Sequence, residues 1–143
     1  MTKLVVIGSS SIDLVVTAHK RPEKGETILG ESFKTVPGGK GANQAVAAAR
    51  LGADVYMVGC VGQDDFGRTI LENFKKNSVN TEYMEPVTDI ETGTAHITLA
   101  EGDNSIIVVQ GANKYVSPDY IEKAMDVFDN ADMVLIQQEI PAE

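Results

Sequence analysis

Residues 37–49 read PGGKGANQAVAAA, a glycine-rich turn that leads into an alanine-rich helix. The three glycines let the backbone adopt positive φ or approach a ligand closely. The first amides of the helix are free donors at the positive end of its dipole, and Lys40 and Asn43 add directed polar groups. The stretch therefore predicts either a binding site for a polar ligand or a tight turn that only starts a helix.

Short apolar runs alternate with helical patterns on both sides of this turn, as expected for a sheet with crossover helices. Residues 4–7, 55–61 and 133–136 are near-continuous apolar runs. Such runs are typical of parallel strands that are covered on both faces. The sequence therefore predicts an α/β fold with a doubly wound, mostly parallel sheet and flanking helices.

Three helices are predicted around these strands. The first follows the glycine turn and ends near Gly52, a typical C-terminal stop. The second covers residues 65–76 and carries one apolar stripe. The third starts with Ser117 as N-cap and Pro118 at the first helical position. Its expected buried stripe is Ile121, Ala124, Met125 and Phe128.

Four further segments do not fit the alternation of strand and helix. Residues 12–18 and 27–36 look like strands joined by a turn at residues 21–26, and residues 94–100 and 105–110 look like a hairpin. They predict either a small second sheet or antiparallel edge strands of the main sheet.

The charge and the cysteine content of the chain indicate which kinds of partner it binds and where in the cell it is located. The net charge is −9 and the basic residues are scattered, which disfavours nucleic acids and anionic membranes as partners. Cys60 is the only cysteine and lies in an apolar run, so it is predicted to be buried and free. The N-terminal apolar run is too short for a signal peptide or a membrane span. We therefore expect a soluble cytoplasmic protein without a structural zinc site.

Four polar residues form a set that suits a sugar. A carboxylate accepts hydrogen bonds from neighbouring hydroxyls, and lysine and asparagine satisfy the rest. Asp13, Lys40, Asn43 and Glu139 supply these groups. Asp13 and Glu139 follow predicted strands, and open α/β sheets bind ligands beyond the carboxyl ends of their strands. Taken singly, Asp13 is equally compatible with a turn and Glu139 with a solvated charge.

Three blocks of sequence resemble the signature of the ribokinase-like sugar kinases, the pfkB carbohydrate kinase family. They are GSSSID at residues 8–13, GGKGAN at residues 38–43 and VGQDDFG at residues 61–67. Within the family, the glycine segment is most similar to that of the ribokinases. The resemblance covers residues 1–143 as an N-terminal half, with the ATP-binding C-terminal half absent.

The resemblance implies a β-sheet lid over the sugar, formed by strands at about residues 12–36 and 94–110, which in the family often also makes the dimer interface. It implies that the substrate-binding residues are Ser11, Asp13, Gly39, Lys40, Asn43 and Glu139. Ser11 departs from the family pattern, because ribokinases commonly have asparagine there. This departure leaves the identity of the sugar open.

The activity implied for the whole enzyme is transfer of the ATP γ-phosphate to the 5-hydroxyl of D-ribose, with Mg²⁺ and activation by K⁺. This chain lacks the family's Gly-Ala-Gly-Asp segment, which carries the catalytic base, and its Asn-x-x-Glu motif. A P-loop is excluded because Lys34 stands where its first glycine is needed. We therefore expect no catalytic residue and no cofactor or metal site in this chain.

Two alternatives remain open from the sequence. The chain is part of a kinase for another sugar or for a nucleoside in the same family, or it is a non-catalytic module for sugar binding or regulation. In either case a homodimer is expected, through the lid strands or through the sheet edge at residues 133–136.

Overall fold

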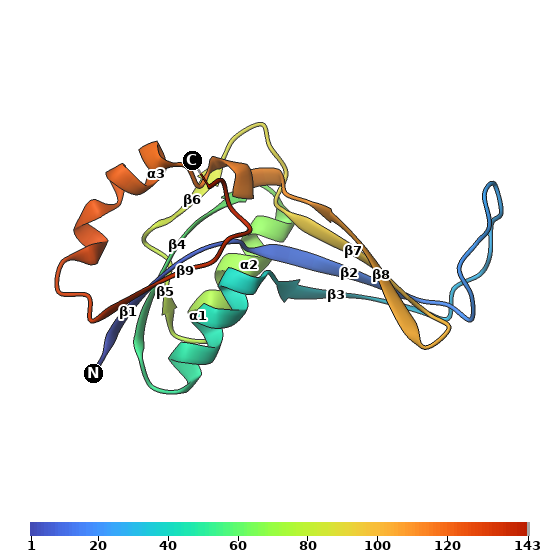
Figure 1. Cartoon of the computed structure of the whole chain (residues 1–143), viewed down its shortest axis with the longest axis horizontal. Coiled ribbons are helices and arrows are strands. Elements are labelled where there is room, and N and C mark those ends of the chain that lie inside the picture. Colours follow the sequence, from blue (N-terminus) through green and yellow to red (C-terminus); the bar gives the residue numbers. More distant parts are fainter. Residues whose placement is uncertain (143) are drawn as a thin grey trace.

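The computed structural model describes residues 1–142, which form an α/β body and a second sheet that projects from it (Figure 1). At the centre of the body, β1 (Lys3–Ile7) pairs with β4 (Asp54–Gly62) on one side and with β9 (Met133–Ile136) on the other. The short strands β5 (Val79–Asn80) and β6 (Met84–Val87) both pair with β4. All of these pairings are parallel, as the apolar runs predict.

Two helices of the body begin and end at residues that the sequence marks. α1 (Lys40–Arg50) ends in a Schellman motif, in which Gly52 has a φ of 95°. The amides of Gly52 and Ala53 donate to carbonyls of the last helical turn at 3.0 and 3.2 Å. α2 (Asp65–Lys76) starts after Asp64, whose side chain caps it.

Helices cover both faces of the body sheet, so the doubly wound architecture is confirmed (Figure 1). Successive side chains of a strand point to opposite faces. Leu4 and Val6 of β1 therefore pack in one cluster with α1 and α2, whereas Val5 and Ile7 pack in another with residues 112–127. The two clusters form the hydrophobic core.

The third predicted helix is shorter than expected. Ser117 caps α3 (Pro118–Lys123) as predicted, but a separate 3-10 helix, η2 (Met125–Phe128), follows it. A 3-10 helix has three residues per turn, which rotates the apolar stripe. Val127 is therefore buried, and the expected burial of Met125 is wrong. The short elements β5 and β6 and the 3-10 helix η1 (Gly111–Tyr115) were not predicted.

The second sheet, called the lid here, has the strand order β3-β2-β7-β8. It comprises β2 (Ser11–Thr17), β3 (Ser32–Gly38), β7 (Thr94–Ala100) and β8 (Asp103–Val109). β2 pairs with β3 and β7 with β8 in antiparallel fashion, while β2 and β7 are parallel. The lid strands are thus a separate sheet, and the interpretation as edge strands of the main sheet is wrong.

Two connections within the lid differ from the predicted ones. The expected strand at residues 27–36 begins only at Ser32, because residues 18–31 form a long loop that extends beyond the sheet in Figure 1. The β7–β8 turn is Glu101-Gly102, with φ values of 56° and 73°. Two residues with positive φ are typical of a type I′ hairpin turn, which is tighter than the predicted four-residue one.

The edge strand β9 is less covered than its composition predicts. Its apolar side chains were expected to be buried on both faces, yet Ile136 is 68% exposed and Met133 and Val134 are also exposed. Cys60, in contrast, is buried as predicted, and burial raises the pKa of its thiol to about 12. Among residues 1–142, no helix has the length and apolar character needed to cross a membrane.

Candidate functional site

The turn after β1 and the turn before α1 pack backbone against backbone. Gly39 has a φ of 94°, and a Cβ added to it would lie 2.9 Å from the Cα of Ser10. A Cβ at Gly41 would lie 2.7 Å from the amide nitrogen of Ser9. The amide of Ala42 donates to the carbonyl of Ser9 at 2.9 Å, so this helix donor is not free for a ligand. The glycines therefore serve close packing as well as backbone conformation.

Two of the candidate residues meet across these turns. The Lys40 Nζ lies 2.8 Å from Oε1 of Glu139, although one side chain opens α1 and the other follows β9. The second carboxylate oxygen of Glu139 accepts a hydrogen bond from the Ser9 hydroxyl at 3.1 Å. Lys40 and Glu139 are 72% and 42% exposed, so a ligand can reach both charges.

Asp13 lies at the base of the lid, beside the same glycine turn. Its carboxylate faces Gly38, where a Cβ would come within 2.7 Å of a carboxylate oxygen. Partial burial raises the pKa of Asp13 above its ordinary value, and a hydrogen bond from the side chain of Ser11 partly offsets the increase. A partly dehydrated carboxylate beside Gly38, which is two residues before Lys40, is well suited to accept hydrogen bonds from a ligand.

Asn43 is the candidate residue that the structure joins least to the others. It lies one turn after Lys40 on α1, and it lines a shallow groove of about 330 Å³ with Pro37, Val46 and Arg50. Within residues 1–142 its side chain makes no hydrogen bond to another candidate residue. Its part in ligand binding stays a prediction.

Sequence reasoning missed two residues that orient the charged pair. The amide and the hydroxyl of Ser9 lie 3.2 and 3.0 Å from Oε1 of the buried Gln137. A hydroxyl carries a single proton, so Ser9 donates to Gln137 or to Glu139, while its amide remains fixed on Gln137. Ser9 lies within the GSSSID block and Gln137 follows β9 directly, but neither position is marked by its residue type.

The third block, VGQDDFG, belongs to an anchor between body and lid. The Asp64 carboxylate accepts hydrogen bonds from the hydroxyl and the amide of Thr92 at 2.6 and 2.9 Å, and from the amide of Gly67 at 2.8 Å. Burial raises the pKa of Asp64, but these hydrogen bonds and the charge of Arg68 outweigh burial and leave the pKa below its ordinary value. Because Thr92 lies two residues before the first residue of β7, Asp64 ties α2 to the start of a lid strand.

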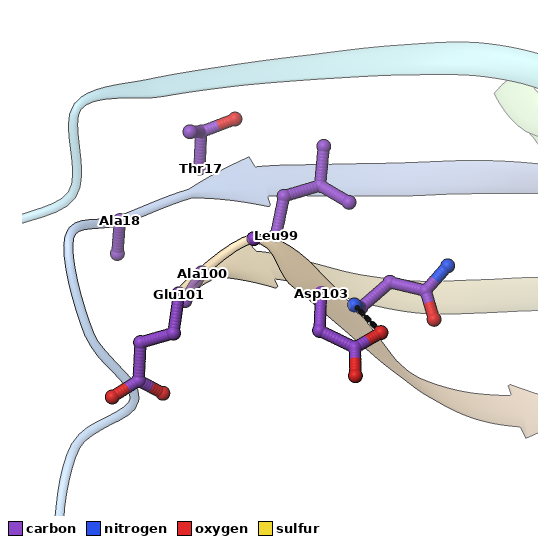
Figure 2. Close-up of a pocket in the computed structure, with 8 residues that line it drawn as sticks. Thr17, Ala18, Leu99, Ala100, Glu101 and Asp103 are labelled. Carbon is purple, nitrogen blue, oxygen red and sulfur yellow. Dashed lines mark hydrogen bonds between the residues drawn. The ribbon is translucent and has the colours of Figure 1, made fainter.

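A cavity of about 470 Å³ at the opposite end of the lid does not involve the candidate residues. Figure 2 shows it between the end of β2 and the β7–β8 turn, where the amide of Asn104 donates to Asp103 at 2.7 Å. β2 runs from Ser11 to Thr17, so at about 3.3 Å per residue the cavity lies roughly 20 Å from the candidate site. It is a gap beside the hairpin turn.

The sequence model of a protein family, the pfkB family carbohydrate kinases, matches residues 1–143 of the chain. The chain belongs to the pfkB family of carbohydrate kinases. Among relatives in the pfkB family, the chain is similar to the ribokinases of Bacillus subtilis (strain 168) and Lactococcus lactis, at 66% and 50% identity over its whole length. It covers 49% and 48% of these relatives, so it spans about half their length.

A solved structure in the pfkB family supports the fold independently. The Arabidopsis thaliana ribokinase complexed with ribose and ATP matches 99% of this chain with a TM-score of 0.86 at 39% identity. The matched region is 47% of that ribokinase. The family and the fold expected from the three sequence blocks are confirmed. The assignments of Ser11, Asp13, Gly39, Asn43 and the Lys40–Glu139 pair to ligand binding stay predictions.

Proposed function

We propose that this chain is the sugar-binding and lid part of a kinase that transfers the ATP γ-phosphate to the 5-hydroxyl of D-ribose. The observation that carries the proposal is the exposed Lys40–Glu139 pair, oriented by Ser9, beside the partly dehydrated carboxylate of Asp13. Such a set of charged donors and acceptors suits adjacent sugar hydroxyls. Similarity to ribokinases over the whole chain supports ribose as the acceptor.

The proposal assigns ATP, Mg²⁺ and the activating K⁺ to the remainder of the kinase. Within residues 1–142, no three His, Cys, Asp or Glu side chains lie close enough together to hold a metal ion. Mg²⁺ in such kinases neutralises charge on the transferred phosphoryl group. The role of this chain is to bind the sugar, to orient its hydroxyl and to cover it with the lid.

Two further parts of the proposal concern assembly and location. A homodimer through the lid is supported by the exposed apolar side chains of Ile106, Ile107 and Val108 on the edge strand β8. The exposed edge strand β9 offers a second surface for association. A cytoplasmic location is supported by the single, buried and unpaired Cys60.

Calorimetric titration with D-ribose, D-fructose and adenosine tests the acceptor. We expect ribose to bind most tightly, and Asp13→Ala to weaken its binding at least about tenfold, since a hydrogen bond to a charged group contributes about 1.5–3 kcal/mol. Asp103→Ala is the matched control, because it removes an exposed carboxylate from the far end of the lid. Equal ribose binding by Asp13→Ala and the parent chain would remove Asp13 from the site.

Phosphorylation of another acceptor is the second candidate function. It is favoured by Ser11, whose hydroxyl side chain is shorter than the amide side chain that ribokinases commonly have at this position. Tighter binding of fructose or adenosine than of ribose would favour it. The non-catalytic alternative is tested by mixing the chain with the C-terminal part of a related ribokinase. Formation of ribose 5-phosphate only in the mixture supports the kinase, whereas its formation by the purified chain alone contradicts the proposed division of roles.

A further inference from the structure

A buried amide side chain connects the lid to the turn that carries the candidate site. Asn113 is 4% exposed and lies in η1, shortly after β8. Its Oδ1 accepts a hydrogen bond from the amide of Ser10 at 2.9 Å. Its Nδ2 donates to the carbonyls of Ser10 and Gln110 at 2.9 and 3.0 Å. Both amide protons and the acceptor are used, so the orientation of the side chain is fixed by its partners.

These contacts join the bases of three lid strands. Ser10 directly precedes β2, and Gln110 directly follows β8. Gly93 directly precedes β7 and lies so close to Asn113 that a Cβ at Gly93 would overlap the Nδ2 atom. The carbonyl of Gly93 in turn accepts from the amide of Ile12 at 3.0 Å. One side chain therefore lies where three strands of the lid leave the body.

Ser10 lies at the centre of the candidate site without being one of its ligand-binding groups. Its neighbour Ser9 orients Glu139, and its neighbour Ser11 begins the strand that carries Asp13. Gly39 packs on the Cα of Ser10 in the same place. A shift of the Ser10 backbone would therefore move the charged pair and Asp13 relative to each other.

We propose that Asn113 is a positioning residue that holds the lid and the Ser10 turn in one fixed orientation. Affinity for the ligand then depends on Asn113 although this side chain does not reach the ligand. The hydrogen-bonding capacity of the amide is what the geometry requires, because a side chain that only filled the space would leave the amide and the carbonyl of Ser10 without partners. The Gln110 carbonyl would keep only its hydrogen bond from the backbone amide of Asn113. The affinity part of this inference rests on the proposed sugar-binding function.

The experiment compares Asn113→Ala and Asn113→Asp with Asn77→Ala. Aspartate has the shape of asparagine but cannot donate to the two carbonyls. Asn77 is a matched control, because its amide also bonds on both sides, to Asn73 and Arg50, but at the end of α2. Hydrogen exchange in β2 and β7 is compared with exchange in β1 and β4. Both Asn113 variants are expected to speed exchange about tenfold in the lid strands only, whereas Asn77→Ala leaves the lid unchanged.

A second readout is the affinity for D-ribose, which is expected to fall about tenfold in both Asn113 variants and to stay unchanged in Asn77→Ala. Parent-like lid exchange in Asn113→Asp would overturn the proposal, because packing alone would then suffice. Equal acceleration in body and lid would also overturn it, since that is loss of general stability. If the parent chain binds no ribose, the proposed function fails for this chain, and lid exchange alone decides the role of Asn113.

Discussion

The α/β body and the lid each contain a β-sheet, but the strands of the body are mostly buried and those at the edges of the lid are mostly exposed. β1 and β4 are buried along most of their length, whereas all seven residues of β8 and most of β3 are exposed. Burial of apolar surface is the main stabilising contribution to a fold. The body therefore determines global stability, while strand pairing and the contacts at its base hold the lid. A region with few buried contacts opens locally at low cost.

Two phenylalanines give the largest test of this comparison. Phe74 of α2 is fully buried in the body, and Phe33 of β3 is 63% exposed on the lid. We expect Phe74→Ala to lower the free energy of unfolding by about 3–5 kcal/mol. Phe33→Ala should change it by less than about 0.5 kcal/mol. Denaturant unfolding measures both values.

The same pair separates stability from association. In light scattering across a concentration series, Phe33→Ala should weaken the proposed self-association through the lid, because it removes exposed apolar surface. A strictly monomeric parent would contradict the homodimer. Similar losses of stability for the two alanine variants would contradict the division into a stable body and a weakly held lid.

An intermediate effect is expected at Asp64, where the body meets the lid. Asp64→Asn should cost about 1–2 kcal/mol at pH 7, because a partly screened carboxylate accepts three hydrogen bonds there. The folded-state pKa of Asp64 is lowered, so its stabilisation is present above the ordinary pKa of 3.8 and is lost as pH falls through the folded value. Thermal unfolding from pH 7 to pH 3 should show the parent and the variant converging at low pH.

The control for Asp64 is its neighbour. Asp65 is exposed and pairs with Arg68 on the surface of α2, so Asp65→Asn should change stability little at any pH. If Asp65→Asn lowered stability as much as Asp64→Asn does, the stabilisation would come from negative charge near the start of α2 and not from the contacts of Asp64 with Thr92.

The smallest expected effect has the opposite sign. Burial raises the folded-state pKa of Asp13, so ionisation of this carboxyl destabilises the fold. The free energy of unfolding of the parent therefore falls as pH rises through that pKa. The corresponding fall should be absent from Asp13→Asn, because asparagine does not ionise. We expect the variant to be slightly more stable than the parent at pH 7 in denaturant unfolding, while its ribose binding is weaker. A less stable variant at pH 7 would mean that the ionised carboxylate is stabilised within the fold.

Features with a local physical cause were predictable from the sequence. Ser117 and Gly52 mark helix boundaries through their own hydrogen bonds and φ angles, and apolar runs mark the buried strands. The rule that ligands bind beyond the ends of parallel strands predicted the place of Glu139, and the glycine turn marked Lys40, with which Glu139 pairs.

Other features depend on contacts between distant segments and leave no local pattern. Asn113 acts through Ser10, and the sequence around it reads as an ordinary loop. β5 and β6 are too short to show a period. The exposure of Ile136 was missed because an apolar run indicates a preference for burial, not the presence of a covering neighbour.

The parallel pairing of β2 with β7 has a consequence for the order in which the chain folds. The registered strands, from Ile12 with Thr94 to Thr17 with Leu99, are separated in sequence by α1, β4 and α2. Such long-range pairing requires closure of a large loop, which is slow unless intervening structure has already brought the ends together. We therefore expect β1 and β4 of the body, which lie closer together in the sequence, to pair before β2 and β7. Until β2 and β7 have paired, these apolar strands lack their partners and are open to mispairing with other chains.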